Sequence, residues 1–339
     1  PRSTWRSVAK WWWGGSPRVL SLNDKQSISC NICIGSIIIV MATTVFQIEG
    51  GVGKHIAATA VIKAYKKAHP KRKIVVVCAY PEIFLRNKDV ARHYRIGMVP
   101  YFYEDYIYKK DVQVFAQDPY RQTAHITKEK HLVQTWCDMI GAPYNNEPTQ
   151  VTFNFREKEV GAAIIDGLIP KNNKPLLIFQ PFGGPGKDHQ PHPYAWTRDL
   201  HPSVAQAIVD KLKDKYNILH ICYEFHPPLN DCIRYDSMVS KKELFSMLPW
   251  SEKRLFIDSS LQHAAAAMGL PSTVTWVATK PEQFGYPFHN NLLPGKEFPR
   301  GLVDSYLYDY SFNGIIHECP YEDVTDIHDA DTIVNAVLA

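Results

Sequence analysis

The stretch from Leu255 to Pro271 constrains the fold of this chain more than any other. It opens with an apolar run that predicts a short strand, followed by Asp258, Ser259 and Ser260, residue types that cap helices. The small residues that follow predict a helix able to lie close against a sheet, and Gly-Leu-Pro predicts where it ends. Because a helix start offers free backbone N–H groups and partial positive charge, this segment predicts a diphosphate site. A capped helix of an ordinary α/β protein explains the same residues.

A second strand, turn and helix lie nearer the N-terminus. Residues 44–54 predict a strand and a glycine-rich turn, and residues 55–68 predict a helix with apolar and small residues at helical spacing. His69 and Pro70 predict the end of that helix, and residues 74–78 predict the next strand. The whole forms one βαβ unit. Its turn contains Gly50, Gly51, Gly53 and Lys54.

Together these segments resemble the lipopolysaccharide heptosyltransferases, glycosyltransferase family nine. Asp258, Leu261 and His263 match the family's Asp-Ser/Thr-Gly-Leu-x-His-x-Ala-Ala segment, with Ser260 in place of the glycine. The family's Gly-x-x-Gly-Asp opening is also present, except that Lys54 replaces the aspartate. The resemblance implies an α/β chain with two Rossmann-like domains facing across a cleft, the GT-B fold. It also implies inverting transfer of a sugar from a nucleotide-diphosphate sugar to a hydroxyl.

Lys54 changes the chemistry expected of the acceptor side. The family's aspartate is implied to take the proton from the attacking hydroxyl, which a charged lysine cannot do. Lysine can instead neutralise a phosphate, a carboxylate or the charge that develops on the leaving diphosphate. We therefore expect the base to be another group, with Glu49, Glu104 and Asp105 as candidates. A chain without such a base would bind a nucleotide sugar and not turn it over, which is the alternative function.

The turn also resembles the P-loop of the partition-type ATPases. That motif needs a Ser or Thr hydroxyl after the lysine for Mg²⁺, and this chain has His55 there. It also needs a first lysine, where this chain has Glu49. A deviant ATPase is therefore the less favoured alternative.

Three segments are predicted along the chain. Residues 1–40 contain a tryptophan-rich run without periodicity, and Met41 directly precedes the first strand, so we expect a non-native or disordered extension. A membrane anchor is the competing interpretation, because residues 26–48 carry no charge. Residues 41–170 are predicted to form an acceptor domain and residues 171–339 a nucleotide-sugar-binding domain, with the boundary at a polar turn after Lys171.

The donor-side candidates stand at the carboxyl ends of predicted strands, where α/β sheets bind ligands. A glycine-rich loop follows the strand at 176–180, and Glu224 ends the strand at 218–223, where the resemblance implies contact with the ribose or base. Lys280 follows the strand at 273–277, in a loop that resembles the family's Gly-Pro-Thr-x-Pro segment. The donor set is Gly183, Gly184, Lys187, Glu224, Asp258, Ser259, Ser260, Leu261, Gln262 and Lys280. The catalytic candidates are His263, Lys54 and Glu49, and the acceptor-side loop comprises Gly50, Gly51 and Gly53.

The composition of the chain limits the classes of binding partner that we expect. A net charge of +4 over 339 residues, without a basic stripe interleaved with aromatic residues, predicts no binding to nucleic acid. Seven scattered cysteines predict reduced thiols and a cytoplasmic protein, and no metal site or cofactor is expected beyond the sugar donor. The implied partners are a nucleotide sugar and a glycan or lipopolysaccharide-type acceptor. Peripheral membrane association and oligomeric state stay open.

Overall fold

The computed structural model describes residues 42–184, 194–236, 240–295, 319 and 321–339. The described residues belong to one compact unit, Val40–Ala339. The predicted extension at 1–40 and the predicted donor residue Lys187 lie outside the described residues.

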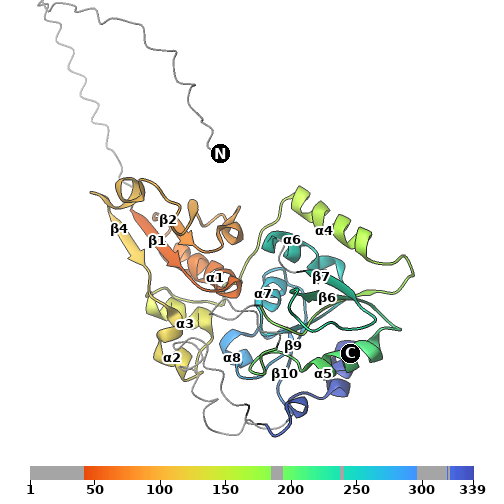
Figure 1. The fold of residues 1–339 in the computed structure, drawn as a ribbon. Coiled ribbons are helices and arrows are strands. Elements are labelled where there is room, and N and C mark those ends of the chain that lie inside the picture. The colour runs from red at the N-terminus through yellow and green to blue at the C-terminus, as the bar shows by residue number, and fades with distance from the viewer. Residues whose placement is uncertain (1–41, 185–193, 237–239, 296–318, 320) are drawn as a thin grey trace, which may run out of the picture. The chain divides into compact units, whose positions relative to one another are not determined.

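Four parallel strands form the first sheet, in the order β3-β2-β1-β4 (Figure 1). Their bounds are β1 Thr43–Ile48, β2 Lys73–Cys78, β3 Arg92–Arg95 and β4 Val112–Phe115. Thr43 of β1 pairs with Lys73 on one side and with Val112 on the other. The apolar residues of β1 and β2 are mostly buried, as expected where helices or loops cover both faces of a parallel sheet.

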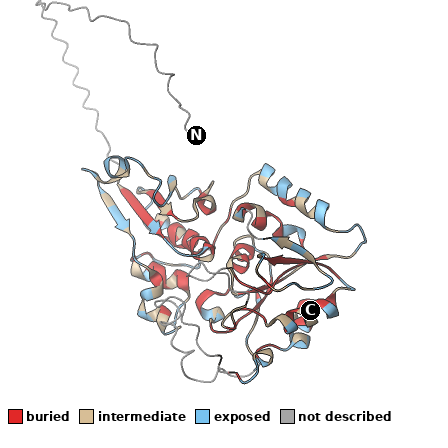
Figure 2. Cartoon of the chain, in the orientation of Figure 1, coloured by how far each residue is buried: buried red, intermediate tan, exposed pale blue. Residues whose placement is uncertain are grey.

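Helix α1 (Val52–Ala68) connects β1 to β2 and is buried over most of its length (Figure 2). Its alanines and isoleucines pack into the main hydrophobic core, which also includes residues of β5, β8 and α7. The other helical segments of this half are short. They are η1 Pro81–Phe84, η2 Tyr103–Ile107, η3 Pro119–Arg121, α2 Thr123–Ile126 and α3 Leu132–Met139.

Six parallel strands form the second sheet, in the order β10-β9-β8-β5-β6-β7. From β5 the chain adds strands on one side and then returns to add β8, β9 and β10 on the other, which is the doubly wound Rossmann order. The strands are β5 Leu176–Gln180, β6 Asn217–Cys222, β7 Ile233–Asp236, β8 Lys253–Ile257, β9 Thr273–Thr275 and β10 Asn290–Leu292.

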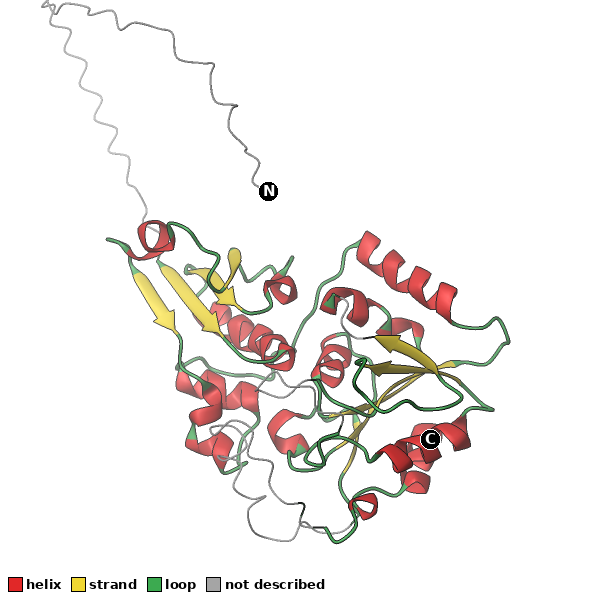
Figure 3. Cartoon of the chain, viewed as in Figure 1, coloured by secondary structure: helices red, strands yellow, loops and turns green. Residues whose placement is uncertain are grey.

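Helices surround this second sheet (Figure 3). The C-terminal helix α10 packs against α5 and is joined to it by an ion pair of 2.8 Å between Lys211 Nζ and Asp331 Oδ1. The helical segments are α5 Pro202–Leu212, α6 Lys241–Ser246, η4 Leu248–Trp250, α7 Ser260–Ala267, α8 Pro281–Phe284, η6 Val324–Asp326 and α10 Ala330–Leu338.

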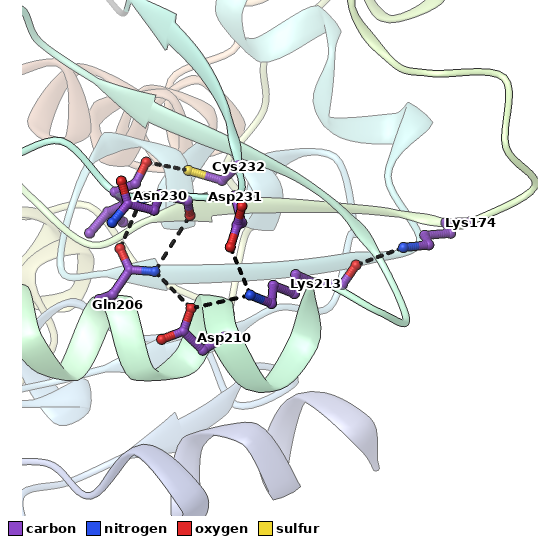
Figure 4. A network of polar contacts seen from close by, with 8 residues as sticks. Lys174, Gln206, Asp210, Lys213, Asn230, Asp231 and Cys232 are labelled. Carbon is purple, nitrogen blue, oxygen red and sulfur yellow. Dashed lines mark hydrogen bonds and ion pairs between the residues drawn. The ribbon is translucent and has the colours of Figure 1, made fainter.

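A polar network on α5 holds the turn that leads into β7 (Figure 4). Gln206 Oε1 accepts a hydrogen bond from the backbone N–H of Asn230 at 2.8 Å. Lys213 Nζ lies 2.7 Å from Asp231 Oδ2, and Asp231 has a positive φ of 57°. These bonds fix the turn from the solvent side, away from the carboxyl ends of the strands.

Helix α4 (Phe155–Leu168) precedes the second sheet in sequence and packs against α6 (Figure 1). Asn154 and Glu157 form a reciprocal capping box at its start. Gly161 lies so close to α6 that a Cβ on it would stand 2.3 Å from the carbonyl oxygen of Ser246. We therefore propose that the second domain begins before Asn154, earlier than the boundary at 170 that the sequence suggested.

Candidate functional site

Each sheet has one point where the strand order reverses, and ligands of α/β sheets bind beside the carboxyl ends of the strands there. In the first sheet the reversal lies between β1 and β4, and in the second between β5 and β8. The segments that follow these four strands carry most of the residues predicted for the site.

At the reversal in the first sheet, Lys54 is paired with Asp118. Lys54 belongs to the first turn of α1, after β1, and Asp118 follows β4. The distance from Lys54 Nζ to Asp118 Oδ1 is 2.8 Å. The ammonium also lies 4.8 Å from the ring centroid of Tyr120 and 5.7 Å from that of Trp136, within cation–π range. Of the three partners expected for Lys54, the structure provides a carboxylate.

The predicted bases have other partners or positions than this pair. Glu49 is exposed at the end of β1, where its Oε1 accepts a hydrogen bond from Gln47 Nε2 at 2.9 Å. Glu104 and Asp105 belong to η2, which precedes β4 and lies near the amino end of the sheet. The neighbouring Tyr106 indicates this position, because its ring centroid lies 5.7 Å from Lys73 Nζ. Lys73 is the first residue of β2.

The glycine turn has the backbone of a helix start without the contacts of a P-loop. Gly50 has a φ of +95°, which favours glycine, and Gly51 caps α1 without a side chain. His55, in place of the hydroxyl residue, forms a hydrogen bond from Nδ1 to the carbonyl of Gly51 at 2.8 Å. Burial lowers the pKa of His55 to about 4. With Lys54 held by Asp118, this turn lacks the two side chains that bind phosphate and magnesium in a P-loop.

Gly53 and His263 bring the starts of α1 and α7 together (Figure 1). A Cβ on Gly53 would stand 2.6 Å from His263 Cδ2 and 3.0 Å from Nε2. His263 is 5% exposed, and its Nδ1 lies 2.9 Å from the hydroxyl of Tyr286. Burial lowers the pKa of His263 to about 3, so the imidazole is neutral at pH 7. The structure thus places His263 at the junction of the two halves.

At the reversal in the second sheet, Ser259 caps α7. Its Oγ accepts a hydrogen bond from the Leu261 N–H at 3.2 Å and donates one to Gln180 Oε1 at 2.5 Å. Asp258 Oδ2 accepts a hydrogen bond from Thr279 Oγ1 at 2.6 Å, and burial raises the pKa of this aspartate. Ser260 is the first residue of the helix and is partly exposed.

Two predicted donor residues turn their side chains into the core. Leu261 and Gln262 are fully buried, and Gln262 Nε2 donates a hydrogen bond to the carbonyl of Phe284 at 3.1 Å. Only their backbone groups remain for a ligand. Glu224 and Lys280 are exposed at the carboxyl ends of β6 and β9, the latter as the residue that precedes α8.

Arg198 is a further candidate that the sequence did not reveal. It covers Gly183 so closely that a Cβ there would stand 2.1 Å from Nη2, and Nη2 donates a hydrogen bond to the carbonyl of Gly184 at 3.2 Å. The buried Asp199 holds the same loop through the Gly183 N–H at 2.9 Å. The positive charge of Arg198 also opposes the rise in the pKa of Asp258. A guanidinium therefore stands at the reversal between β5 and β8.

A cavity of about 650 Å³ is lined in part by Tyr286, whose hydroxyl lies 2.9 Å from His263 Nδ1. Its walls come from residues 131–149, which follow the first sheet, from Ala266 of α7, and from residues 281–291. The lining is mostly apolar and includes Tyr144, Tyr286 and Phe288. The hydroxyl of Tyr286 thus links His263 to a space large enough for a sugar unit.

Within the described ranges, no three His, Cys, Asp or Glu side chains gather in a way that would hold a metal ion. None of the described helices has both the length and the apolar character needed to cross a bilayer.

No protein-family model and no curated protein matches the sequence. Several solved structures match the fold. The glycosyl transferase family 9 protein of Veillonella parvula aligns with a TM-score of 0.60 and 8% identity, over 87% of this chain and 96% of that one. The ADP-heptose lipopolysaccharide heptosyltransferase II of E. coli aligns with a TM-score of 0.51 and 12% identity, over 74% and 89% of the two chains.

A third similar structure is TibC of enterotoxigenic E. coli, an iron-containing dodecameric heptosyltransferase solved in complex with ADP-D-β-D-heptose. It aligns with a TM-score of 0.59 and 11% identity, over 88% of this chain and 76% of that one. These alignments span both sheets. The chain therefore has the GT-B fold, with two Rossmann-like halves, that the sequence suggested.

Proposed function

We propose that the protein is a glycosyltransferase that moves a sugar from a nucleotide-diphosphate sugar to a hydroxyl acceptor. The observation that carries this proposal is the contact between Gly53 and His263, which joins the ligand-binding edges of two separate parallel sheets. A donor on the second edge and an acceptor on the first would meet at that junction. The similar heptosyltransferase structures agree with this arrangement.

The donor diphosphate would bind at the reversal between β5 and β8. Arg198 offers a guanidinium there, which pairs with phosphate in two-pronged geometry, and the start of α7 offers backbone N–H groups. Lys280 would add a second cation from the start of α8.

Transfer would pass through an oxocarbenium-like transition state, in which negative charge grows on the departing diphosphate. Arg198 and the α7 start would stabilise that charge, and the neutral His263 would donate a hydrogen bond. We propose that the reaction needs no divalent metal and inverts the anomeric carbon. The acceptor would be a glycan, of the lipopolysaccharide type by analogy with the similar proteins, and the reaction would take place in the cytoplasm, with any membrane contact peripheral.

Turnover of nucleotide sugars tests this proposal. Release of nucleoside diphosphate from ADP-, UDP- and GDP-sugars would be measured with and without EDTA and glycan acceptors. We expect release from at least one donor, unchanged by EDTA, and a fall of about 100-fold in the His263→Ala protein. Lys213→Gln, a change in the remote α5 network, should leave the rate unchanged.

The second candidate is a protein that binds nucleotide sugars without turnover, which the lysine at position 54 favours. Calorimetry with the same donors distinguishes the two functions. Binding without release from any donor would contradict the transferase and support the binding protein.

A further inference from the structure

We propose that Asp118 is the catalytic base that takes the proton from the attacking hydroxyl. This inference rests on the proposed transferase function and assigns its missing proton acceptor. Asp118 follows β4 at the reversal of the first sheet, the position where an acceptor would bind. Among the candidates drawn from the sequence, Glu49 lies at the same edge but is held, within the described residues, only by Gln47, whereas Asp118 is held by the buried Lys54.

The two carboxylate oxygens of Asp118 have different surroundings. Oδ1 accepts hydrogen bonds from Lys54 Nζ at 2.8 Å and from the Tyr120 N–H at 3.1 Å. Among the described residues Oδ2 has no hydrogen-bond partner, and the side chain is 39% exposed, against 5% for that of Lys54. One oxygen therefore fixes the group and the other remains open to a substrate.

Contacts on both sides tie Asp118 to the donor half. Lys54 is adjacent in sequence to Gly53, which touches His263. The ring of Tyr120 meets Phe284 of α8 edge-on, with centroids 5.9 Å apart. Gln283 Nε2 of the same helix donates a hydrogen bond to the carbonyl of His125 at 3.1 Å. The loop that carries Asp118 is therefore packed against the helix that Lys280 precedes.

The proposed transfer of the sugar to the acceptor hydroxyl needs no further reactant. The acceptor oxygen forms a bond to the anomeric carbon while the bond from that carbon to the diphosphate oxygen breaks, and its electron pair leaves with the diphosphate. The hydroxyl proton passes to Asp118 Oδ2 and is later lost to water. With water as acceptor the same step is donor hydrolysis.

Lys54 acts as a positioning residue in this scheme. Its buried ammonium holds Oδ1 and leaves Oδ2 directed to the acceptor side, and the rings of Tyr120 and Trp136 restrict the lysine. The lysine at position 54 is thus explained by the carboxylate it orients.

The test uses the full chain and the nucleoside-diphosphate sugar panel, with donor affinity from calorimetry and nucleoside diphosphate release in one buffer. Asp118→Asn should lower kcat by about 100-fold or more and leave donor affinity within about twofold. Asp118→Glu should restore part of the rate. Asp231→Asn, which removes the carboxylate paired with Lys213 in the remote α5 network, is the matched control and should keep the wild-type rate.

Asp118→Asn also leaves the buried ammonium of Lys54 unpaired, which could itself disturb the site. The double variant Lys54→Met/Asp118→Asn removes both charges and separates the two effects. If Asp118 is the base, the double variant stays as slow as Asp118→Asn. Recovery in the double variant, or a single variant that keeps more than a tenth of the wild-type rate, would overturn the assignment and leave the transferase standing. Donor binding without release by the wild-type protein would overturn both.

Discussion

The backbone of Gly53 lies directly against the imidazole of His263, which leaves no room for a side chain at position 53. A methyl group there would stand 2.6 Å from His263 Cδ2, well inside van der Waals contact. This contact joins the helices that begin at the binding edges of the two sheets, and it explains why the first turn of α1 contains a glycine despite its low helix propensity.

Gly53→Ala should therefore push α1 and α7 apart. We expect a loss of about 1–3 kcal/mol in the free energy of unfolding, because overpacking in a closed contact costs this much. Urea denaturation measures it. The double variant Gly53→Ala/His263→Ala removes the ring and should recover most of that loss, whereas equal losses in both variants would show that the methyl clashes elsewhere.

Alanine substitutions at Gly183 and Gly184 test whether Arg198 contributes to donor binding. A Cβ on Gly183 would meet the guanidinium at 2.1 Å, whereas one on Gly184 would meet only Tyr223, at 3.5 Å. Gly183→Ala should displace Arg198 and weaken nucleoside diphosphate binding about tenfold, with little effect on stability, because an arginine end can move. Gly184→Ala should keep the affinity. Calorimetry with ADP and UDP checks both, and equal affinities would remove Arg198 from the donor site.

Gly161 and Gly167 test how α4 packs. A Cβ at position 161 would stand 2.3 Å from the Ser246 carbonyl oxygen, whereas one at 167 meets nothing within 4 Å. Gly161→Ala should destabilise the protein by about 1–3 kcal/mol. Gly167→Ala should stabilise it by up to about 1 kcal/mol, because alanine favours the helix. Thermal unfolding of the two variants checks the opposite signs, and a stable Gly161→Ala would show that α4 does not rest on α6.

Acid should destabilise this protein between pH 6.5 and 4. Burial lowers the pKa of eight described histidines from 6.5 to about 3 or 4, so the unfolded chain takes up protons in this interval while the folded chain does not. Each such histidine lowers the free energy of unfolding by up to about 1.4 kcal/mol per pH unit. The stability is therefore full above pH 6.5 and lost on acidification, which urea denaturation at several pH values would show.

His220 offers a single-residue version of that experiment. Its pKa is lowered to about 3 by burial, with the nearby charges of His226 and Arg234 adding to the effect, and it packs against the rings of Phe179 and Phe182. His220→Leu should make the dependence of stability on pH less steep between pH 6.5 and 4. A slope identical to that of the wild type would mean that His220 is not neutral in the fold.

The sequence predicted the central elements of both sheets with accuracy. The strand expected at 74–78 is β2, the one at 176–180 is β5, and the segment after Asp258 is α7. These strands are continuous apolar runs, which parallel sheets buried on both faces require. Glycine, proline and capping residues then marked the helix ends.

The edge strand β4 of the first sheet was harder to predict, and the candidate site residue that follows it, Asp118, was not predicted. Strand β4 alternates weakly, because Gln113 and Val114 are exposed at the edge, so no strand was predicted before Asp118. The partner of Lys54 consequently could not be foreseen, since the pair is 64 residues apart. Arg198 was not predicted for a different reason. Its side chain folds over the loop at Gly183 and Gly184, and the local sequence does not specify the path of that loop.

The contact of Gly53 with His263 should also limit the rate at which a ligand associates. With the imidazole 5% exposed and Gly53 against its Cδ2 edge, we expect a sugar to contact the ring only after α1 and α7 move apart. Motions of this kind take microseconds to milliseconds. The observed association rate of such a ligand should therefore level off at high concentration, at the frequency with which the two helices part.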